Sequence, residues 1–333
     1  MISKPKNTTP QNITPPIRCP NLSCHQKLAQ TVTTSSPIIK KGYFITKWNH
    51  QPVRRYQCLS CLKTFSTHTR RDTYRQKKPY LNQSIFEWYC SGVTLRRMAI
   101  VLRTTRNTVT KKFHFLSELA RKKHEEHVRV GLLKTNKIQF DEMETFEHTK
   151  LKPLSISLSI DAINGKMLSA VSAQAGYKGL LAEVALKKYG PREDTSGSAR
   201  ERALKQTLAC TGSCPISITI DKKSSYPALI QSIFPMVQIH LVHRQQKENA
   251  KSRAQTSIQS GRMTGGSETN ETTEETRPRK ADPLFLLNVS AAKIRHDLSR
   301  MARKVWVTTK KCEFLQRHLD LYIAYHNKYA LFY

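Results

Sequence analysis

The chain has 333 residues, enough for two or three domains. Its 56 lysines and arginines against 24 aspartates and glutamates give a formal net charge of 56 − 24 = +32. A charge of this size repels itself unless a polyanion neutralises it, so nucleic acid is the first partner to consider and an anionic membrane surface the alternative. No apolar run reaches the roughly 18 residues that a membrane-spanning helix needs.

Residues 1–16 have no apolar core of the kind that a signal peptide carries, and we expect them to form a flexible tail. We therefore expect a cytoplasmic, nucleoid-associated protein whose thiols stay reduced. In that setting the 8 cysteines of the chain suggest metal binding before disulfide bonds.

Residues 17–70 hold two short cysteine loops. Cys19 and Cys24 frame CPNLSC, and Cys58 and Cys61 frame CLSC. Between the loops, GYFITKW and PVRRYQC have the pattern of two strands of a hairpin, so the segment predicts a zinc ribbon with four thiolates around structural Zn²⁺. The alternative is four unrelated thiols. We expect Arg54 and Arg55 to contact DNA phosphates, and the remaining cysteines to be structural or incidental: Cys90, Cys210, Cys214 and Cys312.

Residues 80–125 are predicted to form an all-α helix-turn-helix DNA-binding domain. Thr94 is a candidate N-cap for the second helix, and Arg103 stands near the place of the usual turn glycine. Ala99, Val109 and Phe113 would join the last two helices. The candidate recognition helix would turn these residues toward DNA: Arg106, Asn107, Thr108, Thr110, Lys111 and Lys112. The alternative is an ordinary helical hairpin with a solvated basic face.

From about residue 135 the pattern changes to strands and helices. The strand at 137–146 carries Asp141 and Glu142, whose side chains alternate between faces and so cannot both point into one site. A hairpin at 154–173 turns at Asn164-Gly165, which makes the preceding Asp161 a turn residue rather than a catalytic one. A strand ending at Asp221, a helix and a strand at 237–243 follow, which is the order of a ribonuclease H-like α/β fold.

Residues 246–280 are polar and without apolar periodicity, and we interpret them as a low-complexity insert. Helices are predicted at 285–304 and 310–329. An apolar stripe would pack the first of these on the sheet: Leu287, Ala291, Ile294, Leu298, Met301 and Val305. Asn288 lies at the border of this stripe, with Arg295 on the same face seven residues on. By local sequence Asn288 is either a site residue or a helix N-cap.

Over residues 17–333 the chain resembles bacterial insertion-sequence transposases of the IS-one type and their relatives. The most specific segments are QFDEM, SIDAINGK, TIDKKSSYP and LLNVSAAKIRHDLSRMARK, at 139–143, 159–166, 219–227 and 286–304. Such transposases combine a zinc ribbon, a helix-turn-helix and a ribonuclease H-like core whose acidic residues bind divalent metal ions.

The resemblance implies that Asp141 and Asp221 bind two Mg²⁺ or Mn²⁺ ions. The third ligand of the family is usually Glu, but a related subgroup has Asn there, and this position maps to Asn288. Arg295 maps to the basic residue that holds the substrate backbone. Cleavage at the inverted repeats of an element and strand transfer into target DNA would follow, with a homodimer or larger assembly on DNA. The insert stretches the second spacing to 288 − 221 = 67 residues.

Two other functions stay open at this stage. A non-catalytic DNA-binding regulator or decayed transposase would keep only the N-terminal modules, and Asn288 and the insert favour it. A nuclease without strand transfer is the second.

Overall fold

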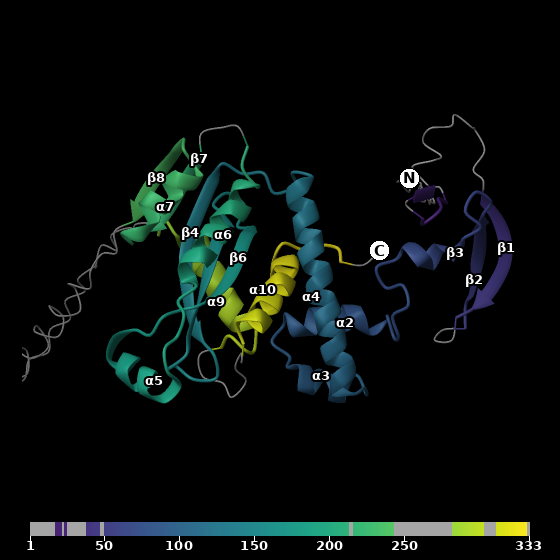
Figure 1. Ribbon diagram of the computed structural model, residues 1–333, viewed down its shortest axis with the longest axis horizontal. Coiled ribbons are helices and arrows are strands. Elements are labelled where there is room, and N and C mark those ends of the chain that lie inside the picture. Colours follow the sequence, from purple (N-terminus) through teal and green to yellow (C-terminus); the bar gives the residue numbers. More distant parts are fainter. Residues whose placement is uncertain are drawn as a thin grey trace, which may run out of the picture. The chain divides into compact units, whose positions relative to one another are not determined.

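The computed structural model describes residues 17–21, 23–24, 38–46, 50–212, 216–242, 282–302 and 311–331 (Figure 1). The chain divides into two compact units, Met1–Leu81 and Asn82–Tyr333. Some of the expectations above lie outside the described residues: the tail at 1–16, Cys214, the whole insert at 246–280, and Val305.

The first unit is built on a small antiparallel sheet of order β1-β2-β3. Its strands are β1 (Ile38–Ile45), β2 (Pro52–Cys58) and β3 (Thr64–Ser66), followed by the 3-10 turn η1 (Thr67–Arg70). The predicted hairpin is therefore confirmed, and β3 adds a third strand. A bulge interrupts β1 between Lys40 and Tyr43, where Gly42 adopts a φ of 69° that favours glycine.

The second unit contains a five-stranded mixed sheet of order β6-β5-β4-β7-β8. Its strands are β4 (Lys137–Phe146), β5 (Pro153–Asp161), β6 (Met167–Gln174), β7 (Ile216–Asp221) and β8 (Val237–Val242). β5 is antiparallel to β4 and to β6, whereas β7 is parallel to both β4 and β8. The prediction of a mixed α/β architecture is confirmed.

Helices cover both faces of this sheet (Figure 1). On one face lie α6 (Ser196–Leu208) and α7 (Ser225–Ile233), and the ring of Phe140 on β4 meets the ring of Tyr226 on α7 edge-on at 5.4 Å. The neighbouring Gln139 points to the other face, because strand side chains alternate, and there it bonds to α9 (Phe285–Asp297). The short helix α5 (Ala182–Tyr189), preceded by η2 (Gly179–Leu181), lies in the connection between β6 and α6.

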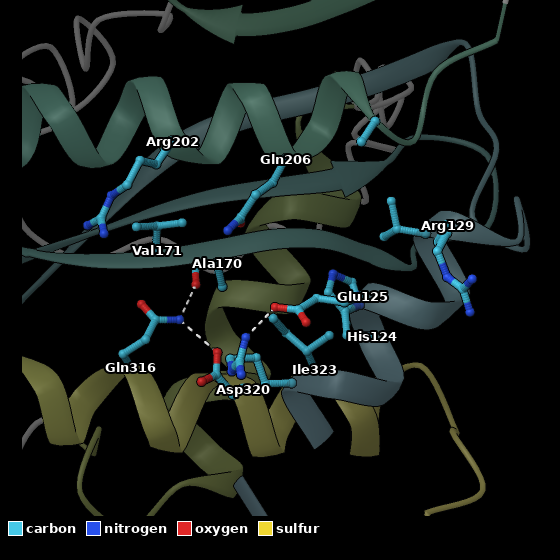
Figure 2. Close-up of a pocket in the computed structure, with 13 residues that line it drawn as sticks. His124, Glu125, Arg129, Ala170, Val171, Arg202, Gln206, Gln316, Asp320 and Ile323 are labelled. Carbon is cyan, nitrogen blue, oxygen red and sulfur yellow. Dashed lines mark hydrogen bonds and ion pairs between the residues drawn. The ribbon is translucent and has the colours of Figure 1, made fainter. Parts of the chain in front are cut away.

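The edge strand β6 is protected by side chains from the helices beside it. Gln316 on α10 (Cys312–His326) accepts from the N–H of Ser172 at 2.9 Å. It also donates to the carbonyl of Ala170 at 2.9 Å (Figure 2), so it bonds to the edge as a neighbouring strand would. The ring of His124 lies 3.0 Å from the carbonyl oxygen of Leu168. These contacts occupy backbone groups that an open edge would offer to another chain.

The three helices predicted from 80–125 are present as α2 (Leu81–Tyr89), α3 (Leu95–Val101) and α4 (Arg106–Arg129). We expected them to form a domain of their own, but they belong to the same compact unit as the sheet. α4 packs along α10, and Tyr89, Phe113 and His318 form an aromatic cluster between the helices. The Tyr89 hydroxyl lies 2.6 Å from Nδ1 of His318.

The helix predicted over 285–304 ends earlier, at Asp297, because Leu298 adopts an extended conformation. The apolar spacing nevertheless continues, since Leu298 and Met301 remain buried in the turn that follows the helix. The pattern of buried apolar positions therefore continues beyond the C-terminal end of α9.

Candidate functional site

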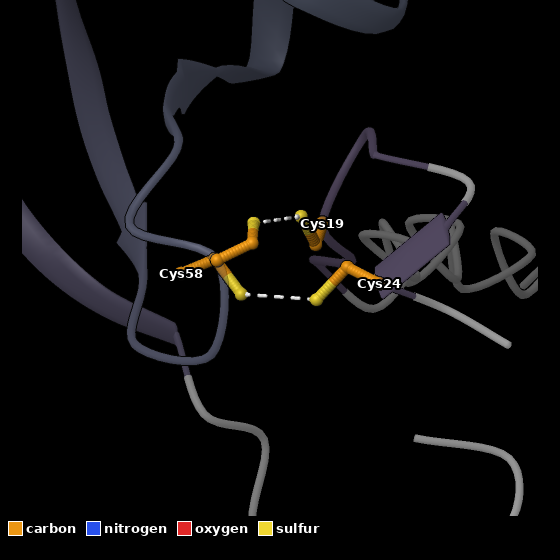
Figure 3. Close-up of side chains that lie close together, drawn as sticks. Cys19, Cys24 and Cys58 are labelled. Carbon is orange, nitrogen blue, oxygen red and sulfur yellow. Dashed lines mark hydrogen bonds between the residues drawn. The ribbon is translucent and has the colours of Figure 1, made fainter. Parts of the chain in front are cut away.

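The four N-terminal cysteines lie together (Figure 3). All of their Sγ atoms are within 4.8 Å of one another; Sγ of Cys19 is 3.5 Å from that of Cys61, and Sγ of Cys24 is 3.6 Å from that of Cys58. Four sulfurs placed tetrahedrally about 2.3 Å from one Zn²⁺ would be about 3.8 Å apart. The arrangement can therefore hold a structural metal ion such as zinc, as the spacing predicted.

The surroundings of this cluster shift the pKa values of two of its thiols in opposite directions. A backbone hydrogen bond from Lys63 lowers the pKa of Cys61 to about 7, whereas burial raises the pKa of Cys24 to about 12. Apart from the cysteines, the hydrophobic cluster of this part of the chain contains chiefly the rings of Tyr56 and Phe65, whose centroids are 5.8 Å apart. A core this small gives little burial, so metal binding would supply much of the folding free energy.

Both arginines predicted to bind phosphate lie on β2 and reach over aromatic rings of β1. The guanidinium of Arg54 is 4.0 Å from the centroid of Tyr43, and that of Arg55 is 5.5 Å from the centroid of Phe44. Arg55 and Tyr43 are exposed and Arg54 is half-buried. Because consecutive strand residues point to opposite faces, the Arg54–Tyr43 and Arg55–Phe44 pairs lie on opposite faces of the small sheet.

The turn between α3 and α4 has the hydrogen bonds of a Schellman motif. Thr104 N–H donates to the carbonyl of Ala99 and Arg103 N–H to that of Ile100, at 2.9 and 3.1 Å. Arg103 has a φ of 47°, so it stands where glycine is usual, as the sequence suggested. Thr94 caps α3 as predicted, accepting from the N–H of Arg97, and Thr105 caps α4 by accepting from Thr108.

The first turns of α4 present most of the predicted recognition residues to solvent. Ala99, Val109 and Phe113 are buried, as expected for the contact between α3 and α4. The candidate DNA-facing residues are exposed at Arg106, Asn107 and Lys111 and half-buried at Thr108 and Thr110.

The predicted outward orientation of Lys112 is wrong. We expected it to face outward, but it is only 4% exposed, and burial lowers its pKa to about 8. Val109, Phe113 and Leu116 are also buried, and positions three and four apart share one face of a helix. Lys112 therefore belongs to the packed face of α4.

Asp141 and Asp221 occupy equivalent positions on neighbouring strands. Phe140 and Ile220 are the last residues paired in the parallel register of β4 and β7, and the two aspartates come next. Residues at the same level of adjacent parallel strands are about 5 Å apart and point to the same face. In both cases the carboxylate Oδ1 accepts a hydrogen bond from the next backbone N–H, that of Glu142 at 2.7 Å or Lys222 at 2.8 Å.

The first turn of α9 is fastened to the same face of the sheet. Gln139, two residues before Asp141, donates to the carbonyl of Pro283 and accepts from the N–H of Leu287, each at 2.8 Å. Because residues two apart on a strand share a face, α9 begins on the side toward which Asp141 points. The residue after Leu287 is Asn288.

Asn288 lies inside α9 and is exposed. Its Nδ2 donates to Oδ2 of Asp282 at 2.8 Å, while the N-cap position is Leu284, which makes no side-chain cap. The N-cap interpretation of Asn288 is therefore wrong. Its carbonyl oxygen is the hard donor atom that Mg²⁺ would prefer.

Arg295 lies two turns further along α9 and lines a pocket of about 280 Å³. Arg300, Glu144 and Thr145 line the same pocket, and Thr145 stands four residues beyond Asp141 on β4, so on the same face. Two arginines, Arg295 and Arg300, thus line a pocket at the end of β4, beyond Asp141.

Tyr226 was not among the site residues predicted from the sequence. Its hydroxyl lies 3.2 Å from Oδ1 of Asp141 and 3.1 Å from Oε2 of Glu142. The two acids lie on opposite faces of β4, as predicted, but one hydroxyl bonds to both of them. In the sequence, the only local signal was an aromatic residue five positions after the strand-end Asp221. Such a signal does not show which side chains the hydroxyl contacts.

Asp161 is a turn residue, as expected. It is buried, and its Oδ1 accepts hydrogen bonds from the Thr135 hydroxyl and the N–H of Ile163 at 3.0 and 2.8 Å. Gly165, in the same turn, has a φ of 72°. The carboxylate of Asp161 therefore stabilises the hairpin turn.

A pocket of about 490 Å³ between α4, α6, α10 and β6 does not contain the aspartate pair (Figure 2). It carries charges of both signs, among them Arg121, Arg202 and Asp320. Burial raises the pKa of Asp320 to about 6, and its carboxylate accepts from Gln316 at 2.8 Å. We attach no catalytic role to this pocket.

No protein-family model matches the chain, and no curated protein matches it either. Within the part of the chain that the structure describes, no helix is both long and apolar enough to cross a membrane.

Proposed function

We propose that this protein is a DNA transposase that binds the inverted-repeat ends of an insertion sequence, cleaves them and joins them to target DNA. The observation that carries the proposal is that Asp141 and Asp221 directly follow the last paired residues of β4 and β7, with the start of α9 held by Gln139 on the face toward which Asp141 points. Strand-end carboxylates beside a helix that offers an amide oxygen form a donor set of hard oxygens, which fits Mg²⁺ or Mn²⁺.

When bound there, the metal ions would supply charge stabilisation and an activated oxygen nucleophile for phosphodiester chemistry. Asp141, Asp221 and Asn288 would hold them. Attack of water on phosphorus breaks the bond to O3′ and frees a 3′-hydroxyl at the element end. Attack by that hydroxyl on a target phosphodiester forms the new bond and releases a target 3′-hydroxyl. Arg295 would contact the DNA backbone from its pocket beyond the aspartates.

DNA binding would come from two surfaces. Arg54 and Arg55 on the ribbon would contact phosphates, and the N-terminal turns of α4 would enter the major groove with Arg106, Asn107, Thr108, Thr110 and Lys111. The net charge of +32 supports a polyanionic partner. Two element ends must be brought together, so we expect a homodimer or larger assembly on DNA.

The alternative is a non-catalytic DNA-binding regulator or a decayed transposase. Two features favour it: the amide of Asn288 donates a hydrogen bond to Asp282, and Asn in place of Glu removes a negative charge from the metal site. Weaker metal binding is the physical consequence of that loss.

Cleavage and joining of labelled DNA from the element ends in Mg²⁺ tests the proposal. Wild type is compared with Asp221→Ala, Asn288→Ala and Asn288→Glu, and Glu183→Ala on the exposed first turn of α5 is the control. We expect wild type and Glu183→Ala to cut and join, and both site alanine variants to bind the ends without cutting. A wild type that binds but never cuts, with no rescue by Asn288→Glu, would favour the regulator. Cutting without joining would indicate a nuclease.

A further inference from the structure

The hydroxyl of Tyr226 occupies a buried position between two carboxylates. Tyr226 lies near the start of α7, is only 1% exposed, and packs its ring edge-on against Phe140. Its hydroxyl is 3.2 Å from Asp141 Oδ1 and 3.1 Å from Glu142 Oε2. A hydroxyl has one proton to donate, so the two carboxylates share it.

Glu142 is held firmly by groups of its own. Its Oε1 accepts from the Ser155 hydroxyl at 2.8 Å, and its Oε2 pairs with Arg200 at 3.3 Å and with the ammonium of Lys223. These contacts hold Glu142 in place as an anchor for the Tyr226 hydroxyl, and its two cationic partners make it a poor metal ligand.

The carboxylate of Asp141 receives hydrogen bonds from two directions at one oxygen. The N–H of Glu142 donates to Oδ1 at 2.7 Å along the strand, and Tyr226 donates to the same Oδ1 from α7. Two donors on one oxygen oppose rotation of the carboxylate about its bond to the chain. Partners of this kind tune metal affinity because they orient the ligand before the ion arrives.

We propose that Tyr226 is a positioning residue that holds the Asp141 carboxylate in its metal-binding orientation, with Glu142 as the anchor of the Tyr226 hydroxyl. This inference rests on the proposed role of Asp141 as a metal ligand. It adds a contact from α7, on the opposite face of the sheet from α9, to the support of the metal site.

Binding of Mn²⁺ to the full-length, zinc-loaded protein tests the inference, measured by titration with electron paramagnetic resonance. Tyr226→Phe removes only the hydroxyl and keeps the ring against Phe140. Tyr322→Phe is the matched control, because the buried Tyr322 hydroxyl donates to the carboxylate of Asp297 at 2.6 Å, away from the aspartate pair. We expect about a tenfold weaker Mn²⁺ affinity in Tyr226→Phe and an unchanged affinity in Tyr322→Phe.

A double-mutant cycle with Asp141→Asn separates positioning from general stability. If Tyr226 acts through Asp141, Tyr226→Phe should cause no further loss of affinity once Asp141 is changed. Equal loss in both backgrounds, equal loss in Tyr322→Phe, or no loss in Tyr226→Phe would overturn the inference alone. If Asp221→Ala and Asp141→Asn leave Mn²⁺ binding unchanged from wild type, the metal site itself is refuted, and the inference with it.

Discussion

The side chain of Gln139 on β4 accepts a hydrogen bond of 2.8 Å from the backbone N–H of Leu287 on α9. The same amide donates to the carbonyl of Pro283, so one side chain satisfies two backbone groups at the start of the helix. A helix start leaves N–H groups without partners inside the helix, and α9 has no side-chain N-cap. Gln139 therefore fixes both the position of α9 and the place of Asn288.

Replacing Gln139 with Leu should loosen α9 on the sheet. We expect a loss of about 1–3 kcal/mol of unfolding free energy, because the buried N–H of Leu287 and the carbonyl of Pro283 lose their partner, together with weaker Mn²⁺ binding. Denaturant unfolding and the Mn²⁺ titration measure the two effects. Gln83→Leu, on the exposed side of α2, is the control and should change neither. Normal Mn²⁺ affinity in a destabilised Gln139→Leu protein would show that α9 does not contribute to the metal site.

The ribbon should depend on zinc for its fold. We expect about one zinc per chain by atomic absorption, lost in Cys58→Ser and kept in Cys312→Ser, whose thiol bonds to Ser172 in the second unit. Removal of zinc with a strong chelator should unfold the ribbon while the second unit keeps its thermal transition. Retention of zinc by Cys58→Ser would contradict the four-cysteine site.

Arg103 offers a test in which glycine stabilises a helix end. With a φ of 47°, Arg103→Gly should raise the free energy of unfolding by about 0.5–1 kcal/mol, because glycine adopts this conformation without steric penalty. Arg97→Gly, on the exposed side of α3, should instead lower it by about 1 kcal/mol. Chemical denaturation of the two variants distinguishes these opposite signs. The same sign for both would refute the Schellman interpretation.

His318 should make the protein less stable in mild acid. Burial, with nearby Arg300 and His114, lowers its pKa to about 3, against about 6.5 in an unfolded chain. Between these values the unfolded state binds a proton that the folded state does not, so stability is present above pH 6.5 and falls as the pH falls. The loss from His318 should be roughly 2 kcal/mol between pH 7 and pH 5.

Unfolding curves at several pH values measure this effect. His318→Gln should flatten the dependence, whereas His148→Gln, on an exposed position, should leave it as in wild type. An unchanged slope in His318→Gln would mean that His318 is not the group responsible.

Local rules explain what the sequence alone determined. Four features depend on residues near in sequence or on fixed ligand chemistry. They are the Thr94 cap, the Asn164-Gly165 turn, the buried contact of Val109 with its neighbours, and the spacing of Cys19, Cys24, Cys58 and Cys61. Hydrogen bonds within a turn and the periodicity of a helix or strand depend on residues close together in the chain, so they can be recognised in the sequence.

Tertiary structure decided the rest. Asp141 and Asp221 come at equivalent positions because of the register between β4 and β7, and no local pattern sets that register. The burial of Lys112 follows from the packing around α4, and the bridge from Tyr226 to two carboxylates joins residues 84 and 85 positions apart. Such contacts form only when distant segments pack, because their free energy comes from burial and hydrogen bonds between elements rather than from the propensity of either one.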